Sequence, residues 1–202
     1  MCPKKFWKLT CFCIIGGLLD ILFEYIFSNV LRLPLFCDTI FCVAMTFYGG
    51  VFCGIATAFF FQLGHFLSWA PGVSYVSLLY FFCSVCIVIT VWLYKKFVID
   101  KHTKSIPYIF AELLMLSLVT CIVASVSGGC ISRICAHIVG TENEFSGPVD
   151  FMLLMVRANI SSPLAAAIVS RIPINIMDRI ITIFAGWGVY LLLKKTDKNQ
   201  KQ

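Results

Sequence analysis

The sequence predicts an all-α integral membrane protein: a six-transmembrane-helix bundle with a re-entrant or broken outer helical element before the last span. Three observations predict this fold: the composition, the lengths of the apolar runs and the placement of the lysines. The chain has 202 residues, of which 60% are hydrophobic and 13% charged, and its mean hydropathy is +0.93. Soluble globular domains are about half apolar and about a quarter charged. We therefore expect a single membrane domain over residues 1–202.

The apolar runs predict the individual spans, because a spanning helix needs about 20 apolar residues. Four runs meet this length: 7–31, 75–94, 108–127 and 173–193. The apolar segment between the first two is too long for one span, and Gly49-Gly50 interrupts it. We expect two short spans there, 35–48 and 50–67, with Pro34 pre-setting the backbone at the start of the first. Since apolar runs recur along the chain, we do not expect the first to be a removable signal.

The lysines predict the topology. They fall in three clusters: Lys4, Lys5 and Lys8; Lys95, Lys96, Lys101 and Lys104; and Lys194, Lys195, Lys198 and Lys201. Because short cytoplasmic loops gather Lys and Arg, the three clusters belong on one face, with an even number of spans between each pair. Four spans up to residue 94 and two more up to residue 193 satisfy this condition. We therefore expect a multi-pass plasma-membrane protein with both termini in the cytoplasm.

The segment 151–172 is hydrophobic enough to resemble a seventh span, but a full crossing would place the lysine tail outside. It also contains Arg157, Asn159 and Pro163. Non-helical backbone survives at membrane depth only where protein or a wet cavity covers it. We therefore predict a broken or re-entrant element, packed against protein, within an outer connection that covers residues 128–172.

No catalytic or metal-binding pattern stands out in the sequence. It contains no HExxH, GxSxG, phosphate-loop or GxGxxG motif, and its three histidines are isolated. Most of the eleven cysteines lie inside apolar runs, where we expect them to pack as small hydrophobes. Cys130 and Cys135 lie in a more polar region, and their redox state stays open. We predict no enzymatic activity, no metal, no cofactor and no nucleic-acid partner.

The start of the last span carries four polar residues on one helical stripe: Arg171, Asn175, Asp178 and Arg179. Ionisable groups inside a membrane usually face the bundle interior and mark ligand or ion pathways. The stripe therefore predicts one wall of a binding pocket. For Asp178 and Arg179, an ion pair that fixes helix packing is an equally good interpretation. Asn175 is the better candidate for ligand contact, because an amide both donates and accepts.

Other polar residues at the predicted outer end complete the candidate pocket. They are Asp38, His65, Trp69, Arg157 and Asn159. His65 is more simply an interfacial histidine, and Trp69 is either an aromatic-belt anchor or a surface on which a flat substrate stacks. In the first span, Asp20 and Glu24 either pair with an arginine or carry a coupled proton.

Three stretches together resemble the substrate-binding S components of energy-coupling factor (ECF) transporters. They are "LPLFCDTIFCVAMTFYGGVFCGIATAFF", "IVASVSGGCISR" and "RIPINIMDRIITIFAGWGVYLL". The first is similar to the family's Asp-led second helix, glycine turn and third helix. The second is similar to the Gly-Gly end of the fifth helix, and the third to the Pro-x-Asn-x-x-Asp-Lys/Arg opening of the last helix.

The resemblance implies a six-helix subunit that captures a vitamin or similar micronutrient. Its partners would be a membrane coupling (T) protein and two cytoplasmic ATPases, so the chain itself would bind no ATP. The family's Asn, Asp and basic positions fall on Asn175, Asp178 and Arg179, and the Asp of the second helix falls on Asp38. Many members carry Ala-xxx-Ala on the first helix where the coupling protein docks. Here Cys13 and Gly17 are the small-xxx-small pair.

Two alternatives to this function stay open. One is a membrane sensor or regulatory subunit, and the other is a stand-alone proton-coupled carrier that uses Asp20 or Glu24. Because arginines suit bidentate recognition of carboxylate or phosphate, the sequence favours a small, partly anionic or zwitterionic nutrient.

Overall fold

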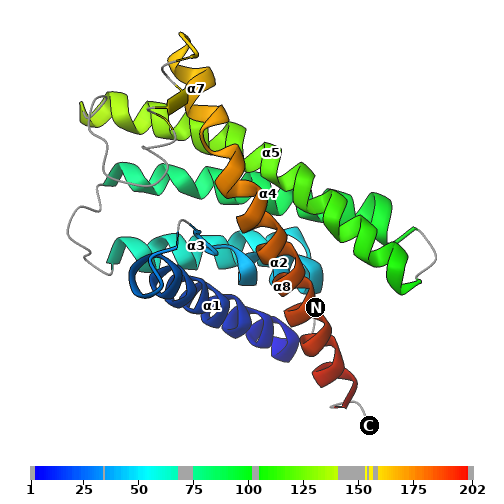
Figure 1. The fold of residues 1–202 in the computed structure, drawn as a ribbon. Helices are drawn as coiled ribbons and strands as arrows, with labels where there is room; N and C mark the ends of the chain where they lie inside the picture. The colour runs from blue at the N-terminus through cyan, green and yellow to red at the C-terminus, as the bar shows by residue number, and fades with distance from the viewer. Residues whose placement is uncertain are drawn as a thin grey trace.

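The computed structural model describes residues 3–33, 35–67, 75–101, 105–140, 153, 155–156 and 159–199. Its principal elements are helices (Figure 1), which are α1 (Pro3–Tyr25), η1 (Ile26–Val30), α2 (Ile40–Gly49), α3 (Val51–Leu67), η2 (Tyr75–Leu79), α4 (Tyr80–Tyr94), η3 (Lys95–Ile99), α5 (Ile106–Val139), α7 (Pro163–Val169) and α8 (Ile172–Asn199). The part of the chain that is described contains no strand, in agreement with the predicted all-α class.

The helices have the length and surface of membrane spans. Four stretches are long and apolar enough to cross a bilayer: Trp7–Ser28, Tyr80–Ile99, Ile106–Val139 and Pro163–Asp197. α2 and α3 are apolar but shorter. Large apolar side chains such as Phe52, Phe110 and Ile122 lie exposed on the bundle. A surface of this kind would be a liability in water and is what a lipid-facing surface requires. The predicted membrane class is therefore confirmed at this level.

α2 is only 10 residues long, which corresponds to a rise of about 15 Å, half of a typical hydrocarbon core. The sequence predicted a span over 35–48, but the helix begins at Ile40. Residues 31–39, which we call the 31–39 segment, are non-helical where they are described; the predicted helix start at Pro34 lies outside the described residues. At the other end of α2, Gly50 has φ of 87°, a conformation that favours glycine. This turn confirms the predicted break between the second and third helices.

α5 is longer than the sequence predicted. It has 34 residues and continues past residue 127, through Gly128 and Gly129, to a left-handed C-cap at Gly140. The two glycines do not end the helix: Gly129 faces α7, and Gly128 faces the side chain of Arg171. A Cβ at Gly129 would lie 2.8 Å from Ile168 Cγ1 and 3.1 Å from the Ile168 backbone. The missing side chain thus lets the two backbones approach closely.

The predicted broken element is described from residue 159 onward and contains a short helix followed by a turn. α7 begins after Ser162, whose Oγ accepts a hydrogen bond from the Ala165 N–H at 3.4 Å. The chain turns at Ser170, and α8 then begins at Ile172. Since α7 packs against α5, this element is covered by protein on one side, as the sequence predicted.

Three lysine-bearing regions meet at one end of the bundle. Lys8 of α1 forms an ion pair with Asp197 of α8, with 2.6 Å between Nζ and Oδ1. Lys95, at the end of α4, donates to the Phe47 carbonyl of α2 at 2.6 Å and lies over the Tyr190 ring of α8. Lys8, Lys95 and the C-terminal part of α8 therefore lie at one end of the bundle, which we call the lysine end. The candidate site lies in the opposite half of the bundle.

Candidate functional site

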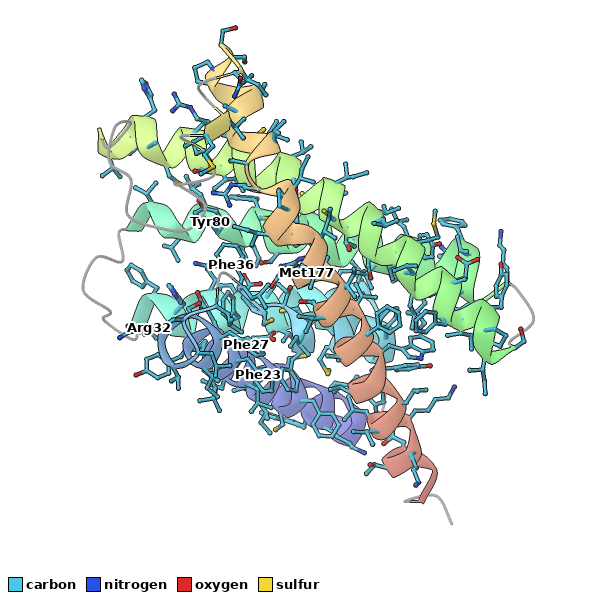
Figure 2. The ribbon with its side chains drawn as sticks, viewed as in Figure 1. Phe23, Phe27, Arg32, Phe36, Tyr80 and Met177 are labelled. Carbon is cyan, nitrogen blue, oxygen red and sulfur yellow. The ribbon has the colours of Figure 1, made fainter. Side chains whose placement is uncertain are left out.

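A cavity of about 270 Å³ lies between the end of α1, the 31–39 segment, α3, α4, α5 and the start of α8. Phe36 and Tyr80 line it (Figure 2), one from the 31–39 segment and the other from the start of α4. Its ionisable and polar lining residues are Glu24, Asp38, Thr39, Gln62, His65, Tyr80, Ser84, Arg171, Asn175 and Arg179. These groups thus gather in a cavity whose lining surface is mostly apolar.

The 31–39 segment is held from one side by Asp178 of α8. Asp178 Oδ1 accepts the backbone N–H groups of Phe36 at 3.0 Å and of Cys37 at 2.7 Å. Cys37 has φ of 46°, in the left-handed region that non-glycine residues seldom occupy. An unpaired backbone N–H is costly at membrane depth. In a helix these two N–H groups would donate to backbone carbonyls; in the non-helical 31–39 segment they donate to the Asp178 carboxylate instead. Asp178 is fully buried behind the cavity wall.

Asp20 of α1 holds the start of α2, the helix that follows the 31–39 segment. Its two oxygens accept the N–H groups of Phe41 at 2.9 Å and of Cys42 at 3.0 Å, in the first turn of α2. An anionic group at a helix N-terminus satisfies the free donors there and complements the helix dipole. No salt bridge to Asp20 occurs among the residues that the structure describes. The predicted pairing with an arginine is therefore not observed, and Asp20 instead caps α2.

Arg179 joins α8 to the 31–39 segment. Its Nη1 donates to Thr39 Oγ1 at 2.7 Å, and its Nη2 donates to Asp38 Oδ1 at 3.3 Å and to Asp178 Oδ2. The Arg179 side chain is only 4% exposed. Its Nε is buried and has no hydrogen-bond partner in the described part of the chain. The guanidinium charge is thus balanced by two carboxylates while one donor stays unsatisfied.

The other residues of the predicted stripe link α8 to α5 and α4. Asn175 is buried, and its Nδ2 donates to Ser125 Oγ at 2.9 Å. Arg171, which directly precedes α8, donates from Nη2 to the Tyr80 hydroxyl at 3.5 Å. A Cβ at Gly128 would lie 3.4 Å from Arg171 Nη1, so the guanidinium rests against α5 at a position without a side chain. Both residues line the cavity.

Glu24 and His65 form the α1–α3 side of the cavity. Their side chains are half-buried and approach to 3.5 Å between Oε2 and Nε2. Both line the cavity, so the two helices bring two titratable groups to the same wall. The sequence singled out each residue separately but did not predict that they meet.

The structure brings together five of the predicted site residues: Asp38, His65, Arg171, Asn175 and Arg179. Asp178 lies behind them as a support for the backbone. Asn159 is exposed, bonds to the Met155 carbonyl at 3.3 Å and is not among the cavity residues. Arg157 and Trp69 lie outside the described residues. Sequence reasoning missed Tyr80, Gln62 and Ser84; the signal for Gln62 and Ser84 was a polar residue within an apolar span.

Cys13 and Gly17, predicted as contacts for a coupling protein, lie inside the bundle. Cys13 is buried and its Sγ lies 3.5 Å from the Cys53 carbonyl of α3. A Cβ at Gly17 would lie 2.8 Å from the backbone nitrogen of Phe61. In the structure this small-xxx-small pair serves close packing of α1 on α3 within the chain. Cys130 and Cys135 are both free thiols.

Comparison with known protein families, curated protein sequences and solved structures finds no match to this chain. The fold and the site therefore define the class on their own: an all-helical protein with helices able to cross a membrane and a cavity lined by both apolar and ionisable side chains in the half away from its lysine end.

Proposed function

We propose that the chain is a membrane-embedded, high-affinity solute-binding subunit, the S component of an ECF-type importer for a vitamin or similar micronutrient. The observation that carries the proposal is the cavity itself. Ionisable groups are costly in a membrane and are found there mainly at ligand or ion pathways. Here four cavity-lining carboxylate and guanidinium side chains, Glu24, Asp38, Arg171 and Arg179, surround an open volume. That volume is close to the lower end of the range for small-molecule sites, so the solute is small.

The proposed topology has six crossings with both termini in the cytoplasm. The shared lysine end supports this orientation, because cytoplasmic loops gather lysine. In this arrangement the 31–39 segment and α2 together make one crossing, and the cavity lies toward the outside. A membrane coupling protein and two cytoplasmic ATPases would supply the energy, and the chain would have no enzymatic activity. Since Cys13 and Gly17 are buried, the coupling protein would contact other residues.

The test is to purify the chain from cells and identify the small molecules that it releases. We expect one solute to be retained in near-stoichiometric amount, and uptake of that solute when the coupling subunits are co-expressed. The variant Arg179→Met should release it, whereas Arg133→Gln, which changes a guanidinium that does not line the cavity, should retain it. Absence of both a retained solute and coupled uptake would refute the proposal.

A stand-alone proton-coupled carrier is the second candidate, and the Glu24–His65 pair favours it. Two titratable groups 3.5 Å apart on the wall of a cavity form a plausible proton site. In liposomes that contain only this chain, a carrier would drive solute uptake from a pH gradient, and Glu24→Gln would abolish that uptake. An S component without its partners would show binding but no such uptake.

A further inference from the structure

We infer that Arg171 is the anchor for an anionic group, a carboxylate or a phosphate, on the solute that the cavity binds. The inference rests on the proposed function and specifies the chemical class of its ligand. It also distinguishes the two cavity arginines by their charge balance: Arg179 is paired with carboxylates of the chain, and Arg171 is left for the charge of the ligand.

The charge balance of the cavity distinguishes the two arginines. Arg179 contacts both Asp38 and Asp178, and a hydroxyl satisfies its other terminal nitrogen. Its positive charge is therefore already compensated. Arg171 has no carboxylate within ion-pairing distance among the described residues, where its side-chain partner is the neutral Tyr80 hydroxyl. The positive charge on the cavity wall that awaits a counter-ion is that of Arg171.

The surroundings of Arg171 fit this role. The guanidinium lines the cavity and is partly buried, so a counter-ion there would be shielded from bulk water. The guanidinium packs against Gly128 of α5, and Tyr80 adds a hydroxyl to the same wall. A guanidinium with free donors binds a carboxylate or phosphate through two parallel hydrogen bonds, which are stronger than neutral ones. The carboxylates Glu24 and Asp38 are other members of the lining and would repel an anion placed near them.

The experiment uses capture from a host-cell small-molecule extract on the full chain in nanodiscs, followed by mass spectrometry of the released solute. Three portions of the extract serve as probes: untreated, esterified with acidic methanol to neutralise carboxylates, and treated with phosphatase to remove phosphate esters. We expect capture from the untreated extract and its loss after one of the two treatments, which identifies the anion. Arg171→Gln should weaken binding of the captured solute roughly tenfold to a hundredfold, because a charge-assisted hydrogen bond is lost.

Two further variants separate binding from folding. Arg171→Lys keeps the charge but loses the bidentate geometry, so its affinity should lie between those of the wild type and Arg171→Gln. Arg133→Gln removes a guanidinium outside the cavity and should bind as the wild type does. If Arg171→Gln binds the solute as tightly as the wild type, or if both treated extracts still yield it, the anion anchor is refuted while the solute-binding function stands. If the wild-type chain captures nothing from any extract, the proposed function fails and the anchor with it.

Discussion

Replacing Asp178 should destabilise the protein more than any other single carboxylate substitution in the described bundle. Asp178→Ala would leave the N–H groups of Phe36 and Cys37 without their acceptor and would remove one of the two counter-ions of Arg179. An unsatisfied buried donor costs about 1–3 kcal/mol, and removing one partner of a buried ion pair costs about 3–5 kcal/mol. Because these effects overlap, we expect a loss of about 5 kcal/mol, comparable to the whole stability of many domains.

The assay is reversible unfolding of the purified chain in mixed detergent, followed by helical circular dichroism. Asp178→Asn keeps an oxygen that can accept from the N–H groups of the 31–39 segment. Its loss of unfolding free energy should therefore be smaller than that of Asp178→Ala, about 2–3 kcal/mol. The matched control is Asp197→Asn at the lysine end, where Asp197 is 35% exposed, pairs with Lys8 and accepts from the Tyr48 hydroxyl. Asn keeps an oxygen for that hydroxyl, and exposed ion pairs contribute about 1 kcal/mol or less.

A double variant tests the mechanism directly. Asp178→Asn alone leaves the buried guanidinium of Arg179 with one counter-ion fewer. Combining it with Arg179→Met removes that guanidinium as well, so this part of the penalty disappears. Its destabilisation should be smaller than the sum of the two single effects, since partners in one network are not additive. If Asp178→Ala is as mild as Asp197→Asn, or if the double variant is strictly additive, the role of Asp178 as a clamp on the 31–39 segment is refuted.

The other predictions concern packing and capping, and each is measured as a change in unfolding free energy in the same assay. Asp20→Ala should cost about 1–3 kcal/mol because α2 loses its N-terminal acceptor, and an effect below about 0.5 kcal/mol would exclude capping. Gly129→Val should cost about 1–3 kcal/mol by forcing α7 away from α5, whereas Gly128→Ala, which meets only ordinary contacts, should be nearly neutral. Gly17→Ala should destabilise the α1–α3 contact by a similar amount, and Gly188→Ala, which meets nothing within 4 Å, is its control; equal effects at the two positions would contradict the close approach.

The features of the fold that the sequence predicts well are those that depend on composition and period. Apolar runs locate the long helices because a span needs a fixed length of apolar residues. The Gly49-Gly50 break is predictable because a positive φ favours glycine. By contrast, the helical continuation through Gly128 and Gly129 depends on the approach of Ile168, a residue distant in sequence. A local pattern does not contain that information.

The candidate site also has features that the sequence predicts and features that it does not. The helical period predicts that Arg171, Asn175 and Arg179 share one face, and the structure places all three on the cavity wall. The period does not reveal that Asp178 turns toward the backbone of the 31–39 segment, since this depends on a loop whose path no short-range rule specifies. The same limit applies to Cys13, whose spacing from Gly17 indicates close packing but not which partner it packs against.

The length of α5 has a consequence for its placement in a bilayer. Its 34 residues rise about 51 Å, and a helix tilted by 40°, the upper end of the usual range, would still cover about 39 Å along the membrane normal. Since the hydrocarbon core is about 30 Å thick, roughly 9 Å of this helix must emerge into the headgroup layer at one end or be shared between both. If the end after Gly129 emerges, the contact between α5 and α7 would sit near the lipid headgroups, where water and dissolved ions reach the rim of the cavity.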